Sequence, residues 1–306
     1  MAGTQENPIE YPKLDLPETV ERQTVTVWSL GLALDADVYR PKNLKKEDKC
    51  PGVVMSHGVG GDKFTCERYA AKFAEAGMIA ISFSQASWGQ SQGRMMLAGE
   101  AQELPGAGQP VAGVVMAHEL LDPMEWVDCY RSATDYLEGE PNIDPERMGA
   151  WGTSFGGGTA LYSTATDPRL KALAIQVPAV FNTPPEMAEV ARVRARQIAR
   201  GETKPIPQGP PDVLPNLRGT PHLGRFLQYR VADQVDAVDV PTMILVAENE
   251  EMFDNEVSGG AAYKKLLARG VECYYEVLPD IDHYGIYFGG FERGSQLALQ
   301  WFIDHL

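Results

Sequence analysis

Ser154 lies at the centre of the pattern Gly152-Thr153-Ser154-Phe155-Gly156. A serine in G-x-S-x-G is typical of a nucleophile elbow, where a strand turns sharply into a helix and exposes the hydroxyl. The two glycines permit the close backbone approach that such a turn requires. The pattern therefore favours attack by Ser154 on a carbonyl carbon. The alternative is a glycine-rich turn whose serine only caps a helix.

His283 is the expected general base for this serine. A carboxylate must hold the imidazole in the correct tautomer, and after an elbow of this kind the chain order is nucleophile, acid, histidine. His283 follows Ser154 and lies on a short loop after an expected strand. The other histidines precede the serine, lie in a proline-rich segment or adjoin the C-terminus (His57, His118, His222 and His305). For His57 we expect a bracing role within its own loop.

The acid of the catalytic set is expected in an acidic loop that follows another apolar run. Glu250 stands a few residues past the end of that expected strand and is the preferred acid, with Asp254 as the alternative. Asp282 is disfavoured because adjacent residues rarely turn their side chains toward each other. The expected catalytic residues are Ser154, His283 and Glu250.

Two backbone amides are expected to stabilise an oxyanion. The apolar run 51–57 ends in His57-Gly58-Val59-Gly60-Gly61, a glycine-rich loop at the carboxyl end of a buried strand. The amide of Val59 in this loop and the amide of Phe155, directly after the nucleophile, are the expected donors. The helix that begins there also directs its positive end toward developing negative charge.

Four further residues are expected to contact the substrate. Trp88 lies in a glycine-punctuated loop, and Tyr284 adjoins the expected base. His222 lies in the proline-rich segment, and Met95 begins an insertion at about 95–118, where simple packing is the alternative. No metal ligand set or cofactor motif is expected, because the four cysteines are scattered and form no C-x-x-C pair.

The elements that must position these residues alternate between strand and helix, which predicts βαβ crossovers and a mostly parallel sheet. An antiparallel hairpin at 23–28 and 32–39 is expected at the sheet edge. Short apolar runs predict buried strands (51–57, 78–83, 149–153, 170–177, 241–246 and 272–278). Helical patterns occupy the intervening segments (66–76, 123–138, 159–166, 186–200, 224–235, 258–269 and 291–306).

Three regions are expected along the chain. Residues 1–20 are a polar, proline-rich arm, and residues 21–177 and 237–306 form the α/β core. Residues 178–236 break the alternating pattern, with prolines from 205 to 221 that disfavour regular structure. An irregular segment of this length inside a compact domain is usually functional, so we expect a cap inserted between the sixth and seventh strands.

The composition narrows the partners. The chain has 306 residues, 44% hydrophobic residues and a net charge of −15, which disfavours nucleic acids and anionic membranes. No apolar run approaches transmembrane length, and the N-terminal residues lack the apolar centre of a signal peptide, so a cytoplasmic protein is expected. A small-molecule substrate is the expected partner, and a homodimer is possible.

These motifs together resemble the α/β-hydrolase superfamily, in particular its dienelactone-hydrolase-like and prolyl-peptidase-like branches. The resemblance covers roughly 25–177 and 240–305. It implies the α/β-hydrolase fold. Members of these branches usually carry aspartate where this chain has Glu250, and dienelactone hydrolases use a cysteine nucleophile where it has Ser154. The serine favours the esterase or peptidase side.

The expected function is a serine hydrolase that cleaves a small ester, thioester or lactone through an acyl-enzyme. Two alternatives keep the same residues: a hydrolase of carbon–carbon bonds or an acyltransferase. A third is a non-catalytic binding protein on the hydrolase scaffold.

Overall fold

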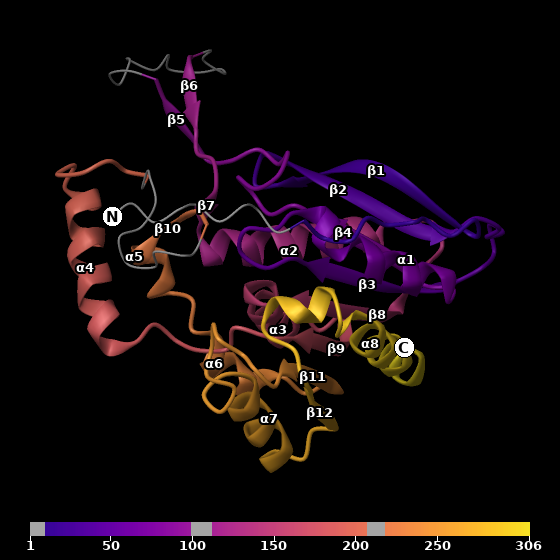
Figure 1. Cartoon of the computed structure of the whole chain (residues 1–306). Coiled ribbons are helices and arrows are strands. Elements are labelled where there is room, and N and C mark those ends of the chain that lie inside the picture. Colours follow the sequence, from indigo (N-terminus) through magenta and orange to yellow (C-terminus); the bar gives the residue numbers. More distant parts are fainter. Residues whose placement is uncertain (1–9, 99–111, 207–217) are drawn as a thin grey trace.

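A computed structural model describes residues 10–98, 112–206 and 218–306. Its centre is an eight-stranded sheet (Figure 1) in which the β1–β2 and β2–β4 pairs are antiparallel and the remaining pairs are parallel. In spatial order the strands are β1 (Val20–Ser29), β2 (Leu32–Pro41), β4 (Ile79–Phe83), β3 (Cys50–Ser56), β8 (Ile143–Thr153), β9 (Leu170–Gln176), β11 (Thr242–Ala247) and β12 (Cys273–Leu278).

Helices cover both faces of the sheet, and the sheet separates the core into two apolar layers. On one face lie α1 (Glu67–Glu75) and α8 (Phe291–His305), and on the other lie α2 (Pro123–Glu138), α3 (Phe155–Thr166) and α7 (Gly259–Ala268). The central strands β4 and β11 consist entirely of buried residues, because both faces are covered. The predicted α/β-hydrolase architecture is confirmed.

Helix α2 shows how local sequence sets these elements. Asp122 accepts hydrogen bonds from the backbone amides of Met124 (3.1 Å) and Glu125 (3.2 Å), and Pro123 occupies the first helical position. Its predicted apolar face is fully buried against the sheet (Trp126, Tyr130, Ala133 and Leu137). Capping and apolar periodicity therefore agree with the packing.

The segment between β9 and β11, the sixth and seventh strands of the sheet in chain order, is the predicted insertion. It contains α4 (Pro185–Ala199), β10 (Thr220–Pro221), α5 (Leu223–Phe226), α6 (Val231–Gln234) and a 3₁₀ turn (Val235–Ala237). We call residues 178–236 the cap. In Figure 1, α4 stands well away from the sheet.

Two expectations about the cap were wrong. The single helix predicted over 224–235 is interrupted between α5 and α6, where Arg230 has a non-helical backbone (φ −103°, ψ 64°). The adjacent Tyr229 is 3% exposed and stacks on Tyr162, so tertiary packing overrides the local helical preference. The proline-rich segment was also expected to lack regular structure, yet Thr220–Pro221 form β10, which pairs with β7 (Leu120–Leu121). Residues 207–217 of this segment lie outside the described residues.

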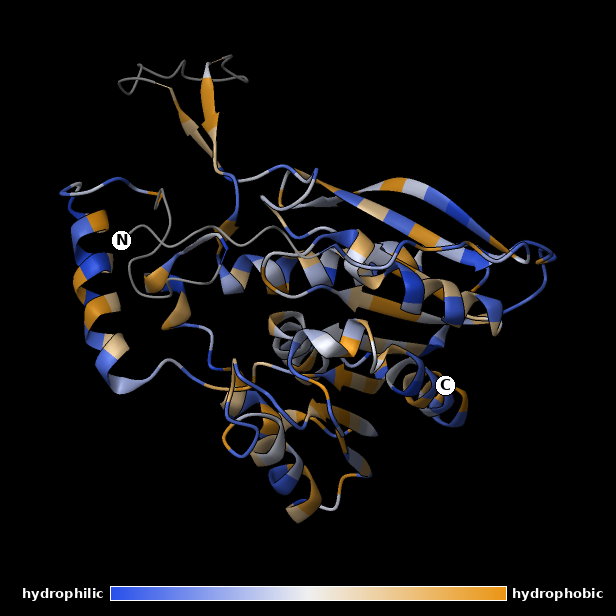
Figure 2. Ribbon diagram, viewed as in Figure 1, coloured by the Kyte–Doolittle hydropathy of each residue, from blue (hydrophilic) through white to orange (hydrophobic). Residues whose placement is uncertain are grey.

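The insertion after Trp88 projects from the body as a hairpin of β5 (Met95–Leu97) and β6 (Val114–Met116) (Figure 1). Its strands are apolar, as the colouring of Figure 2 shows, yet their side chains are largely exposed. Within the described part of the chain, no helix is long and apolar enough to cross a membrane.

Candidate active site

Ser154 occupies the junction between β8 and α3, with a left-handed backbone (φ 55°, ψ −126°). A non-glycine residue in such a region costs on the order of 1–3 kcal/mol and is held there by its surroundings. A Cβ on Gly156 would lie 2.2 Å from the carbonyl oxygen of His57, and one on Gly152 would lie 2.2 Å from that of Gly156. Both glycines are therefore required for the turn that presents the serine.

His283 connects Ser154 to Glu250. Its Nε2 lies 3.0 Å from Ser154 Oγ, and its Nδ1 lies 2.8 Å and 2.9 Å from the two carboxylate oxygens of Glu250. The side chains of His283 and Glu250 are each 2% exposed, so the pair is shielded from water. The alternative acid, Asp254, instead accepts a hydrogen bond from the backbone amide of Glu256 (2.8 Å). The structure thus brings together the three residues expected from the sequence.

Two further glutamates of the same loop hold the backbone of the histidine loop. Glu251 Oε2 accepts a hydrogen bond from the amide of His283 (2.9 Å), and Glu248 Oε2 accepts one from the amide of Asp280 (2.9 Å). These contacts join the loops after β11 and β12 at their carboxyl ends. The sequence alone left open which of the clustered carboxylates is the catalytic acid. The structure gives them two roles, because Glu250 orients the imidazole while Glu248 and Glu251 anchor the backbone of the histidine loop.

Aromatic rings enclose the imidazole of His283. The rings of Phe253 and Tyr284 meet it edge-on, each with centroids 5.3 Å away. Phe181, at the start of the cap, packs on Phe253 at 5.4 Å and is 37% exposed. Tyr284 therefore lies beside the base, and its contact with a substrate stays a prediction. Phe253 contacts the same imidazole and Phe181 packs behind it, and neither was identified from the sequence.

The glycine-rich loop 57–61 lies directly against the nucleophile. A Cβ on Gly58 would be 2.7 Å from Ser154 Cβ and 3.2 Å from Ser154 Oγ, so only glycine fits. Within the described part of the chain, the amides of Val59 and Phe155 donate no hydrogen bond to another protein group. Two free donors beside the serine are suited to an oxyanion.

His57 braces this loop from within the core. Its Nδ1 lies 2.7 Å from the carbonyl oxygen of Gly58, and its Nε2 accepts a hydrogen bond from the amide of Gln85 (3.0 Å). Complete burial lowers the pKa of His57 to about 4, so the ring is neutral at pH 7. The bracing role expected for His57 agrees with these contacts.

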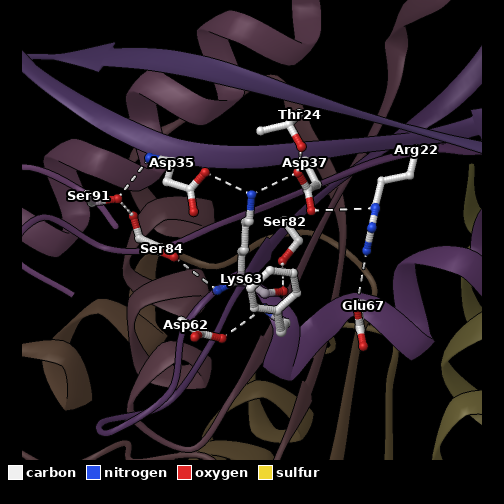
Figure 3. Close-up of polar contacts among 11 residues, drawn as sticks. Arg22, Thr24, Asp35, Asp37, Asp62, Lys63, Glu67, Ser82, Ser84 and Ser91 are labelled. Atoms are coloured by element: carbon white, nitrogen blue, oxygen red, sulfur yellow. Dashed lines mark hydrogen bonds and ion pairs between the residues drawn. The ribbon is translucent and has the colours of Figure 1, made fainter. Parts of the chain in front are cut away.

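The other end of the loop is anchored by a buried lysine (Figure 3). Lys63 Nζ donates to Asp35 and Asp37 of β2, each at 2.8 Å, and its side chain is 6% exposed. The Lys63 amide donates to Ser84 Oγ (3.1 Å), and the Lys63 carbonyl accepts from Ser82 Oγ (2.6 Å). The turn that follows Gly61 is therefore fixed to β2 and β4.

A buried polar network lies behind the elbow. Thr153 Oγ1 and Tyr287 OH are 2.6 Å apart, and Gln176 Nε2 donates to Thr153 Oγ1 (3.2 Å) and to Tyr69 OH (3.1 Å). Tyr69 OH in turn donates to the carbonyl of Ile286 (3.0 Å). Thr153 precedes Ser154, and Tyr287 ends the 3₁₀ turn Tyr284–Tyr287 after His283. No sequence pattern indicated this network.

For three of the residues expected to contact the substrate, the structure shows surroundings that do not indicate such a contact. Trp88 is 1% exposed, packs edge-to-face on Trp126 and donates to the carbonyl of Leu120, so no ring surface remains for a ligand. Met95 is 43% exposed on the projecting hairpin. His222 directly precedes α5, burial lowers its pKa, and its buried Nδ1 finds no hydrogen-bond partner among the described residues.

No group of three or more histidine, cysteine, aspartate or glutamate residues within the described ranges is arranged to hold a metal ion. All four cysteines are free thiols, and three of them are buried.

The sheet topology and the serine elbow define an α/β-hydrolase. The sequence model of the acetyl xylan esterase (AXE1) family matches residues 18–189, more than half of the chain. The chain belongs to this family. The match spans the elbow and the glycine-rich loop but ends before Glu250 and His283.

Individual proteins are also similar to this chain. An uncharacterised 31.7 kDa protein of Escherichia coli is 26% identical over 291 residues, covering 84% of this chain and 92% of that protein. The thiohydrolase aneE of Aspergillus aculeatus is 26% identical over 186 residues, 58% of this chain and 52% of its own. The crystal structure of the hypothetical protein PA2218 of Pseudomonas aeruginosa superposes with a TM-score of 0.68 at 18% identity, with both chains fully covered.

Proposed function

We propose that this protein is a serine hydrolase that cleaves small esters or thioesters through an acyl-enzyme on Ser154. The observation that carries the proposal is the continuous contact from Ser154 Oγ through His283 to Glu250, with distances of 3.0 Å and 2.8 Å. Hydrogen-bonded nucleophile, base and orienting acid on a strained elbow are the arrangement that nucleophilic catalysis requires.

In the first half-reaction, His283 Nε2 accepts the proton of Ser154 Oγ as the oxygen attacks the carbonyl carbon. Glu250 accepts the hydrogen bond of His283 Nδ1–H and stabilises the imidazolium that forms. The tetrahedral oxyanion is held by the amides of Val59 and Phe155, each donor being worth about 3 kcal/mol of barrier. His283 then protonates the leaving alcohol or thiol, and the serine ester remains.

In the second half-reaction, water takes the place of the leaving group. His283 accepts a proton from the water as it attacks the acyl carbon, and returns that proton to Ser154 Oγ when the tetrahedral intermediate collapses. The products are the free acid and the regenerated serine. Membership in the acetyl xylan esterase family supports an ester substrate, and the thiohydrolase relative supports a thioester.

The test is hydrolysis of 4-nitrophenyl acetate and an acetyl thioester by the wild type and by Ser154→Ala. Loss of a triad nucleophile should lower kcat by at least about 10³-fold. A fluorophosphonate probe should label the wild type at Ser154, located by peptide mass, and leave the variant unlabelled. Unchanged turnover in Ser154→Ala would exclude this mechanism. If the wild type itself showed neither turnover nor labelling, the result would indicate a binding protein.

An acyltransferase with the same residues is separated by its acceptor. Adding a primary alcohol or amine during turnover should not change the yield of free acid if water is the natural acceptor. Quantitative transfer of the acyl group to the added acceptor would identify the transferase instead.

A further inference from the structure

A cavity of about 270 Å³ lies within the cap. Its walls come from the segment before α4, from α4 and from the α5–α6 turn, all within the described residues. Six residues line it (Thr183, Ala188, Arg192, Phe226, Leu227 and Arg230). None of them belongs to the catalytic groups described above.

One aromatic contact connects the lining of this cavity with the nucleophile elbow. The ring of Phe226 lies 5.9 Å from that of Phe155, the residue that follows Ser154. In the chain, Thr183 is two residues from Phe181, whose ring packs on Phe253, and Phe253 in turn contacts His283. The cavity therefore lies one ring away from the residue that follows the nucleophile, a position suited to a substrate subsite.

The lining is divided between an apolar surface and cationic ends. Phe226, Leu227 and Ala188 supply the apolar part, while Thr183 Oγ1 is already bonded to the carbonyl of Phe226 (3.0 Å). Arg192 and Arg230 add guanidinium groups from two separate elements.

The arginines are only partly neutralised by their neighbours. Glu189 lies 3.4 Å from Arg192 and 3.3 Å from Arg196, so one carboxylate serves two cations, whereas Arg230 pairs with Asp233. Two guanidinium groups therefore line this cavity although the chain as a whole has a net charge of −15. Guanidinium matches the geometry of a carboxylate with two parallel hydrogen bonds.

Building on the proposed hydrolase activity, we propose that the cavity binds an apolar part of the substrate that ends in a carboxylate. Its volume of about 270 Å³ exceeds the roughly 150 Å³ of an apolar cavity that holds benzene, which suits a chain or ring of at least about six heavy atoms. The substrates are then either half-esters of dicarboxylic acids or acyl esters of hydroxy acids.

Two matched pairs of esters test this. For the acyl side, mono-4-nitrophenyl adipate is compared with 4-nitrophenyl hexanoate. For the alcohol side, 4-acetoxybenzoate is compared with phenyl acetate. We expect kcat/KM to favour the carboxylate-bearing member by about tenfold or more in one pair, and that pair identifies which side of the ester enters the cavity.

The arginines are tested through this ratio. Arg192→Gln and Arg230→Gln should each bring the ratio toward one. Arg200→Gln, which removes the same charge at the exposed end of α4, should keep the wild-type ratio. In addition, Ala188→Phe, which fills the cavity, should lower kcat/KM for hexanoate more than for 4-nitrophenyl acetate if the acyl side is bound.

The result that would overturn this inference is a ratio near one in both pairs, or a preference that persists in both arginine variants. Neither result affects the proposed function, which is judged by whether hydrolysis of 4-nitrophenyl acetate depends on Ser154. Conversely, loss of the serine dependence would refute the hydrolase while leaving carboxylate binding measurable by calorimetry with adipate monomethyl ester.

Discussion

Thr153 and Tyr287 share a hydrogen bond of 2.6 Å between two buried side chains that lie 134 residues apart in the chain. Thr153 is the residue before the nucleophile, and Tyr287 ends the turn that follows the base. The bond therefore ties the strand that carries Ser154 to the segment that carries His283. We expect the 3.0 Å contact between Ser154 Oγ and His283 Nε2 to depend on this support as well as on the loops that carry the two residues.

Thr153→Val should lower kcat more than it changes KM, because it leaves Tyr287 OH buried without this partner and loosens the alignment of Ser154 and His283. An unsatisfied buried hydroxyl should also cost about 1–3 kcal/mol of unfolding free energy. The double variant Thr153→Val, Tyr287→Phe removes both hydroxyls of this bond and should recover part of that stability, because Gln176 Nε2 still lacks its acceptor at position 153. If kcat stays at the wild-type value in the single variant, the bond has only a structural role.

Glu250→Gln should lower kcat by roughly 10³–10⁴-fold with little change in KM, because an amide allows the wrong tautomer of His283. Asp254→Asn is the matched control on the same loop and should stay near the wild-type rate, since its carboxylate caps a turn at Glu256. Steady-state kinetics of both variants on one ester show whether Glu250 or Asp254 is the catalytic acid. A larger loss in Asp254→Asn would reassign the acid.

Lys63→Met should lower kcat and weaken binding of a boronic acid inhibitor, because the glycine-rich loop loses its anchor to Asp35 and Asp37. It should also cost about 3–5 kcal/mol of stability, since Asp35 loses its cation and the buried Asp37 keeps only the longer ion pair with Arg22 (3.9 Å). Lys63→Met combined with Asp37→Asn should regain part of the stability but not the inhibitor affinity.

The control for Lys63→Met is Arg169→Met. It breaks an ion cluster with Asp167, Asp135 and Glu138 that, within the described residues, makes no contact with the glycine-rich loop. It should lower stability with kcat unchanged. Equal effects of the two variants on inhibitor affinity, at matched loss of stability, would show that Lys63 does not position the oxyanion donors.

Stability should fall as the pH drops from about 6.5 to 4, because the folded state keeps His57 neutral. Its pKa is lowered from 6.5 to about 4 by burial, so in this window the unfolded chain binds a proton that the folded protein does not. The contribution present above pH 6.5 amounts to about 3 kcal/mol and is lost on acidification. Urea unfolding at pH 7, 5.5 and 4.5 measures it. His57→Gln should flatten this dependence, and an unchanged slope in that variant would assign the effect to other groups.

The residues of the candidate site that the sequence predicts are those with a local pattern or a fixed chain order. Gly152-x-Ser154-x-Gly156 specifies a turn, and buried strands followed by short loops place Glu250 and His283 at one edge of a parallel sheet. Distance in the chain does not matter there, because parallel strands bring their carboxyl ends together.

The supporting residues lack such patterns. Lys63 reaches acceptors on β2 that are 26 and 28 residues away, and Thr153 reaches Tyr287 across the sheet edge, so only the fold reveals them. In the cap, the interruption between α5 and α6 depends on where Tyr229 packs, which its local sequence does not encode. The expectation for Trp88 was wrong because a tryptophan in a glycine-rich loop is equally compatible with burial.

The glutamates that hold Asp280 and His283 have a consequence for recombination between relatives. The loop after β11 supplies one acceptor to the imidazole and two to the backbone that carries it. A chimera that took only β12 and the histidine loop from a relative would separate His283 from the three glutamates that orient it. Crossover points should therefore fall before β11, so that the acidic loop and the histidine loop come from the same parent.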